Sequence, residues 1–369
     1  GDSRFVGKGV RKAVMAVNTE IRKSLTGLDA DNQEYIDKCL IELDGTPNKG
    51  RLGANATLAV SMAVTRAAAI VKGVPLYVHL SKGPYSLPVP FMNILNGGAH
   101  ANWQGADFQE YMIAPAGAPD FPEAVRWGCE VYQSLKGILK KKGLSTGVGD
   151  EGGFAPAVPS NRAPLELIVG AIESAGYRPG KDISLAMDPA SSEFFSEGSY
   201  TLKSEGRSLS SEEMIGYYAD LTDSFPVISI EDGLAEDDWS GWVRMTRELG
   251  RKIQLVGDDL FVTNTSRISR GISEQAANAV LIKLNQIGTV SETIEAVAMA
   301  KKAGWNSMIS HRSGETVDSF IADLSVSLCT GQIKTGAPCR GERVEKYNQL
   351  IRISEALGSQ AVYAGKKGR

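Results

Sequence analysis

Residues 227–232 read VISIED, a short β-branched run that ends in two carboxylates. A run of this length between helical stretches is typical of a buried strand. Similar runs recur along the chain at residues 183–187, 253–256, 280–282 and 308–309, and more weakly around Ile333. Amphipathic stretches such as residues 291–303 separate them. This alternation predicts parallel strands joined by crossover helices.

Two further apolar strands are expected upstream, at residues 88–95 and 108–113, with helices following at about residues 121–142 and 163–175. Counting them gives eight strands, enough to close a TIM-type barrel with the element order ββαα(βα)6. An open doubly wound sheet is the alternative that the strand pattern alone leaves open.

The first 85 residues have a helical pattern and too few strands for a domain of their own. We therefore expect an α/β barrel domain at residues 86–369. Ahead of it, residues 1–85 would be the helical remainder of a smaller α+β domain.

The composition is that of an ordinary globular protein, with 42% hydrophobic and 22% charged residues among 369. A net charge of −3 gives no basic excess for binding nucleic acid. The four cysteines form no CxxC pair, which favours a reduced, cytoplasmic compartment. We find no signal peptide and no uninterrupted apolar run of about 18 residues, so no membrane span is predicted.

Charged side chains follow six successive apolar runs. They are Asp188, Glu231, Asp258, Lys283, His311 and Lys334. Any one of them could be a helix cap or a loop residue. Six at the same end of their strands favour an active site, because barrel active sites lie at the carboxyl ends of the strands.

The three carboxylates Asp188, Glu231 and Asp258 form a hard oxygen-ligand set without Cys or His, which suits Mg²⁺. A Ca²⁺ site is the alternative, but its ligands usually come from one short loop. We therefore predict a magnesium site formed by three different strands.

Two lysines, Lys283 and Lys334, carry positive charge opposite these carboxylates. Lys283 follows an apolar strand, where it is either a structural partner of the carboxylates or a general base with a lowered pKa. Together, Lys334 and Arg312 predict an anionic substrate, since Arg can grip a phosphate or carboxylate in bidentate fashion.

Two glycine-rich loops also carry titratable groups. Residues 96–101 read NGGAHA and include His100, whereas residues 149–153 read GDEGG and include Glu151. Paired glycines permit close approach to a ligand, although a plain turn explains either loop alone.

The motifs together resemble the enolase family, across essentially the whole chain, with a likeness to bacterial members. The matching stretches are residues 7–10, 43–46, 52–56, 96–101, 149–153, 229–232, 257–260, 283–289, 310–316 and 331–336. The resemblance implies a glycolytic lyase that removes water from 2-phosphoglycerate to give phosphoenolpyruvate. It also implies a TIM barrel behind an N-terminal α+β domain.

The resemblance assigns a role to each site residue. Lys283 would take the C2 proton, and Mg²⁺ on Asp188, Glu231 and Asp258 would stabilise the enediolate, a pairing already known for this superfamily. Glu151, supported by Glu110, would protonate the leaving C3 hydroxyl. The residues implied at the substrate are His100, Gln109, His311, Arg312, Ser313 and Lys334, with the phosphate on Arg312 and Ser313 and the carboxylate on Lys334.

Three departures from the family pattern stand out. Members have roughly 55 residues ahead of the point that matches Gly1, including a mobile loop that helps bind a second Mg²⁺ and exclude water. We therefore expect that the N-terminal part of the family is missing from this chain. One extra residue lies between His100 and Gln109, in a loop with Trp103, and Val317 stands where the family usually has Glu.

Two other functions remain open at this stage. Another superfamily member, such as an acid-sugar dehydratase or a racemase, would act on unphosphorylated acids. A catalytically impaired scaffold or a surface-binding moonlighting protein is the second alternative. We expect a homodimer or larger homo-oligomer, and an additional cell-surface pool is compatible with the sequence.

Overall fold

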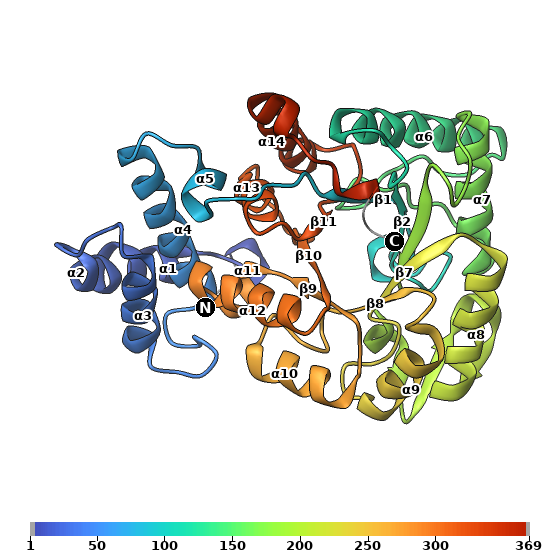
Figure 1. The fold of residues 1–369 in the computed structure, drawn as a ribbon. Helices are drawn as coiled ribbons and strands as arrows, with labels where there is room; N and C mark the ends of the chain where they lie inside the picture. Colours follow the sequence, from blue (N-terminus) through green and yellow to red (C-terminus); the bar gives the residue numbers. More distant parts are fainter. Residues whose placement is uncertain (1–3, 367–369) are drawn as a thin grey trace.

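The barrel is the centre of the computed structural model, which describes residues 4–366 (Figure 1). Eight strands close it in the order β1-β11-β10-β9-β8-β7-β3-β2. Their bounds are β1 Val89–Asn96, β2 Glu110–Ala114, β3 Ser184–Asp188, β7 Val227–Glu231, β8 Gln254–Gly257, β9 Ala279–Ile282, β10 Asn306–Ser310 and β11 Gly331–Lys334. The predicted barrel is therefore confirmed, and the open sheet is excluded.

One strand departs from the expected parallel arrangement. β2 runs antiparallel to both β1 and β3, whereas the remaining neighbours in the barrel are parallel. The connection from β1 to β2 is a loop without a crossover helix, and such a short connection returns the chain antiparallel to the strand it left.

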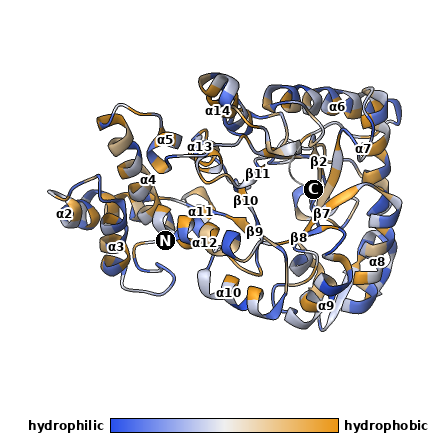
Figure 2. Cartoon of the chain, in the orientation of Figure 1, coloured by the Kyte–Doolittle hydropathy of each residue, from blue (hydrophilic) through white to orange (hydrophobic). Residues whose placement is uncertain are grey.

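Helices surround the barrel on the outside (Figure 1). They are α6 Phe121–Lys141, α7 Arg162–Ser174, α8 Ser211–Ser224, α9 Trp239–Leu249, α10 Thr265–Glu274, α12 Val290–Lys302, α13 Phe320–Ser327 and α14 Gly341–Leu357. Their starts are capped locally: Ser210 and Glu213 form a capping box on α8, and Thr289 caps α12. The helices carry hydrophilic as well as hydrophobic residues, as expected for a layer between barrel and solvent (Figure 2).

The N-terminal part is helical, as predicted. It comprises α1 Arg11–Ala16, a π-helical turn Val17–Ile21, α2 Arg22–Leu25, α3 Gln33–Asp44, α4 Ala54–Val71 and α5 Leu76–Leu80. A small separate core forms here around Ile21, Ile36 and Leu40. By length and composition α4 could cross a bilayer, which the sequence criterion overlooked; core helices of soluble proteins pass the same test.

Several contacts fasten this helical part to the segments that follow the carboxyl ends of β9 and β10. Lys49 pairs with Glu292 at 2.8 Å, and Arg66 pairs with Asp318. The Thr57 hydroxyl donates to the Gly288 carbonyl at 2.9 Å, and the Asn285 amide donates to Asn55 at 3.1 Å. The N-terminal helices therefore hold the loops that follow Lys283 and Arg312.

Candidate active site

The predicted site residues meet at the carboxyl end of the barrel. A cavity of about 180 Å³ opens there. Predicted residues in its wall are Gln109, Glu110, Glu151, Asp188, Asp258, Lys283, His311, Arg312, Ser313 and Lys334. The remaining two lie against this wall, since Glu231 contacts Lys334 and His100 contacts Ser313.

Lys334 occupies the centre of the carboxylate set. Its ammonium lies 2.8 Å from Asp188, 2.8 Å from Glu231 and 3.2 Å from Glu110, and its side chain is buried. Burial lowers the pKa of Lys334, but these carboxylates outweigh it and raise the pKa well above its ordinary value. Lys334 is therefore a fixed cation that neutralises part of the site.

Lys283 forms a second ion pair, with Asp258. The other Asp258 oxygen accepts a hydrogen bond of 2.9 Å from Gln286. Burial lowers the pKa of Lys283, but Asp258 and Glu231 raise it above its ordinary value. The lowered pKa predicted for a base depends on nearby Mg²⁺, so it stays a prediction.

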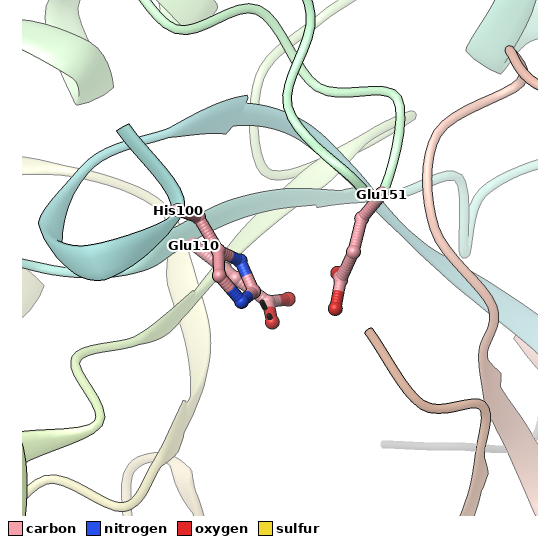
Figure 3. Close-up of side chains that lie close together, drawn as sticks. All are labelled: His100, Glu110 and Glu151. Carbon is pink, nitrogen blue, oxygen red and sulfur yellow. Dashed lines mark ion pairs between the residues drawn. The ribbon is translucent and has the colours of Figure 1, made fainter. Parts of the chain in front are cut away.

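The opposite wall gathers two carboxyls and two imidazoles. His100 and Glu110 lie side by side, and Glu151 faces them from its glycine loop (Figure 3). Burial and the neighbouring Glu151 raise the pKa of Glu110 well above its usual range. Burial acts in the same direction on Glu151, but His311 and Lys334 hold its pKa well below the usual range. In this pair, Glu110 therefore has the higher pKa and Glu151 the lower one.

Backbone geometry explains the position of His100. A side chain at Gly97 would collide with the Phe108 carbonyl, so only glycine lets the two ends of this loop approach. Asn102 and Trp103 in this loop adopt left-handed conformations, and the Lys203 ammonium lies over the Trp103 ring. His100 Nε2 still lies 3.3 Å from the Ser313 hydroxyl, so it stays at the cavity.

The oxygen donors at the mouth of the barrel match the ligands that Mg²⁺ prefers. Glu231 Oε2 is buried and has no hydrogen-bond partner in the described part of the chain, as expected of an oxygen that binds a cation. Within residues 4–366, two lysines face the six buried carboxyls, which are Glu110, Glu151, Asp188, Glu231, Asp232 and Asp258. The oxygen donors and the excess of negative charge fit a hard divalent cation.

The three predicted ligands do not lie in one tight group. Within residues 4–366, the groups close enough to share an ion are His100 with Glu110 and Glu151, and Asp232 with Asp258 and Asp259. Asp232 already accepts hydrogen bonds from the amides of Asp258 and Asp259. The two lysine ammoniums separate Asp258 from the other predicted ligands, Asp188 and Glu231.

Sequence reasoning missed Arg343, near the start of α14. It is 1% exposed, and its guanidinium contacts the loops of both Glu151 and His311. Arginine is almost never fully buried without partners. From sequence alone, an arginine in the first turn of a helix looks solvent-exposed, so no signal distinguished it.

A closed barrel whose mouth combines buried lysines, carboxylates and imidazoles defines a TIM-barrel enzyme that moves protons on an anionic substrate. Residues 84–369 match the family described as "Enolase, C-terminal TIM barrel domain", and residues 1–80 match "Enolase, N-terminal domain". The chain belongs to the enolase family and is a carbon–oxygen lyase of the phosphopyruvate hydratase type.

Curated relatives agree with this assignment. Enolase 1 of Methanospirillum hungatei JF-1 is 76% identical over 367 residues, which cover 100% of this chain and 86% of the relative. Enolase 2 of the same organism is 68% identical over 100% of this chain and 86% of the relative. Enolase 2 of Pseudomonas syringae pv. syringae is 61% identical over 98% of this chain and 85% of the relative. Because the N-terminal family match already begins at residue 1, the expectation that the chain lacks part of that domain is not supported.

Proposed function

We propose that Lys283 is the base that removes the C2 proton of 2-phosphoglycerate in this chain. The observation that carries the proposal is the position of this partly buried lysine, at the end of β9 and across the cavity from the Glu110–Glu151 pair. An elimination needs a base on one side of the substrate and an acid on the other, and the cavity offers both.

Mg²⁺ held by Asp188, Glu231 and Asp258 would neutralise the substrate carboxylate and the charge that develops on it when C2 loses its proton. Asp258 then has less negative charge to offer Lys283, so the pKa of this lysine falls towards that of a base. Lys334 keeps the remaining carboxylates in place and lies where the substrate carboxylate binds.

The Glu110–Glu151 pair supplies the proton for the leaving C3 hydroxyl, which departs as water. Glu110, whose pKa is raised by burial and by Glu151, is the member that takes up this proton more readily, and Glu151 presents Oε1 towards Ser313 at 3.3 Å. The phosphate binds at Arg312 and Ser313, where the Arg312 guanidinium is oriented by Asn285 at 2.7 Å. His100, Gln109 and His311 complete the wall around the substrate.

The same proposal includes the setting of the enzyme. We infer a cytoplasmic, Mg²⁺-dependent homodimer or larger homo-oligomer that acts on a phosphorylated small molecule. A catalytically impaired scaffold would have lost the base, the acid or a ligand, whereas Lys283, Glu151 and the three carboxylates are all present.

Exchange of the C2 proton into D₂O tests the base assignment. The wild-type chain should exchange this proton of 2-phosphoglycerate, and Lys283→Ala should lose about 10²–10⁴-fold in exchange rate while it still binds substrate. Lys302→Met, on the exposed face of α12, is the matched control and should exchange normally. Near-normal exchange by Lys283→Ala would refute the assignment. Turnover of unphosphorylated acids would favour a superfamily dehydratase instead.

A further inference from the structure

Arg343 ties together the two loops that carry Glu151 and His311. Its terminal nitrogens donate to the carbonyls of Arg312 at 2.6 Å, Ser313 at 2.8 Å and Asp150 at 3.0 Å. The chain makes room for it at Gly336, where an added side chain would press against the Arg343 stem. The guanidinium is therefore held rigidly within the wall of the site.

The same guanidinium lies 2.7 Å from His311 Nδ1. Arginine has only donors and stays charged at any working pH, so Nδ1 must accept this hydrogen bond. A neutral imidazole with an accepting Nδ1 carries its proton on Nε2. That nitrogen lies 3.3 Å from Glu151 Oε2, and it makes no hydrogen bond to any group in the described chain.

The geometry points to a positioning role for Arg343: it holds His311 in the Nε2–H tautomer, so that His311 donates to Glu151 Oε2. Asn93 donates to the same oxygen at 3.1 Å. Both donors together commit Oε2 to the protein and leave Oε1 facing Ser313 and the cavity. For the reaction, the consequence is that Glu151 exchanges protons through Oε1, and this consequence rests on the proposed function. The tautomer of His311 does not depend on the proposed function.

The other two states of His311 conflict with its surroundings. The Nδ1–H tautomer would set a donor against the guanidinium and leave Nε2 as an acceptor facing a carboxylate. An imidazolium would place a second cation 2.7 Å from Arg343 in a fully buried site. Only the Nε2–H tautomer satisfies both neighbours at once.

The tautomer can be read directly by NMR of ¹⁵N-histidine-labelled protein. The chain has only His79, His100 and His311, so His79→Gln and His100→Gln spectra identify the His311 signals without altering His311. We expect a proton on Nε2 and an unprotonated Nδ1 at neutral pH, with Mg²⁺ and with EDTA. A His311 protonated on Nδ1, alone or in addition to Nε2, would overturn the proposal, whether or not the variants fold.

Two substitutions test the role of Arg343. Arg343→Lys keeps a cation that can only donate, and it should preserve the Nε2–H tautomer. Arg343→Met removes the donor, so His311 should populate both tautomers and kcat should fall on the order of 10- to 100-fold, as when an outer partner of a site ligand is lost. A folded Arg343→Met with wild-type tautomer and kcat would contradict the positioning role.

Substitutions of His311 separate its two nitrogens. The amide nitrogen of His311→Gln can reach the position of Nε2 and donate to Glu151, whereas the shorter His311→Asn can only accept from Arg343. We expect His311→Gln to retain the higher kcat. Equal or reversed kcat values would contradict a role for the donor at Nε2. If no variant or wild-type protein turned over, the NMR result would still decide the tautomer independently of the proposed function.

Discussion

Replacing Lys334 with Met should destabilise the metal-free protein severely. The substitution keeps the approximate length and apolar stem of the side chain but removes the ammonium that lies within 3.2 Å of Glu110, Asp188 and Glu231. Removing one partner of a buried ion pair costs about 3–5 kcal/mol, because the opposite charge stays buried without compensation. We therefore expect a loss of about 3–5 kcal/mol in the metal-free protein.

Thermal unfolding in EDTA measures this effect. At about 2 °C per kcal/mol for a large domain, Tm should fall by roughly 6–10 °C. Mg²⁺ should restore part of the loss, since a ligand at 100 times its Kd adds about 2.7 kcal/mol. Lys302→Met, which removes an exposed lysine without an ion pair in the described chain, should change stability by less than about 0.5 kcal/mol. A Lys334→Met protein as stable as this control would refute the account of a neutralising lysine.

Three further outcomes follow from the same contacts. Asn285→Ala frees the Arg312 guanidinium, so KM for 2-phosphoglycerate should rise about 3- to 10-fold with little change in kcat, as steady-state kinetics would show. Burial and Asp188 raise the pKa of Glu231 above 4.5. The contribution of this carboxyl to the stability of the fold is therefore complete below pH 4.5 and is lost as the pH rises through the pKa of the folded state. Between pH 4.5 and the folded pKa of Glu231, binding of Mg²⁺ should release the proton of this carboxyl. Calorimetry in buffers of different ionisation enthalpy should detect the released proton, and binding without proton release would contradict a protonated Glu231. A double-mutant cycle on Arg66 and Asp318 should give a coupling of about 0.5–1 kcal/mol that weakens with salt, and a salt-independent value would argue against an ion pair.

The barrel could be predicted because a charged residue directly follows several of its short apolar strands, and this pattern is visible in the sequence. Glu231 and Lys283 each follow a short apolar run, and parallel strands bring such ends to one rim. Even the weak run around Ile333 proved to be β11. The direction of β2 does not follow from its hydrophobic pattern; it follows from the short, helix-free connection between β1 and β2.

Side-chain partners could not be predicted, since they depend on distances across the barrel. The sequence placed Lys334 opposite the carboxylates as a substrate ligand, whereas it lies among carboxylates from β2, β3 and β7. Arg343 contacts His311 from 32 positions away.

The central claim is that this chain dehydrates 2-phosphoglycerate with Mg²⁺ at the mouth of its barrel. The most direct test is to incubate the protein with 2-phosphoglycerate and follow phosphoenolpyruvate by its ultraviolet absorbance, first with Mg²⁺ and then after EDTA. The account predicts turnover with Mg²⁺, its loss in EDTA, and recovery when Mg²⁺ is returned. A folded protein that produced no phosphoenolpyruvate with Mg²⁺, or that turned over equally in EDTA, would contradict it.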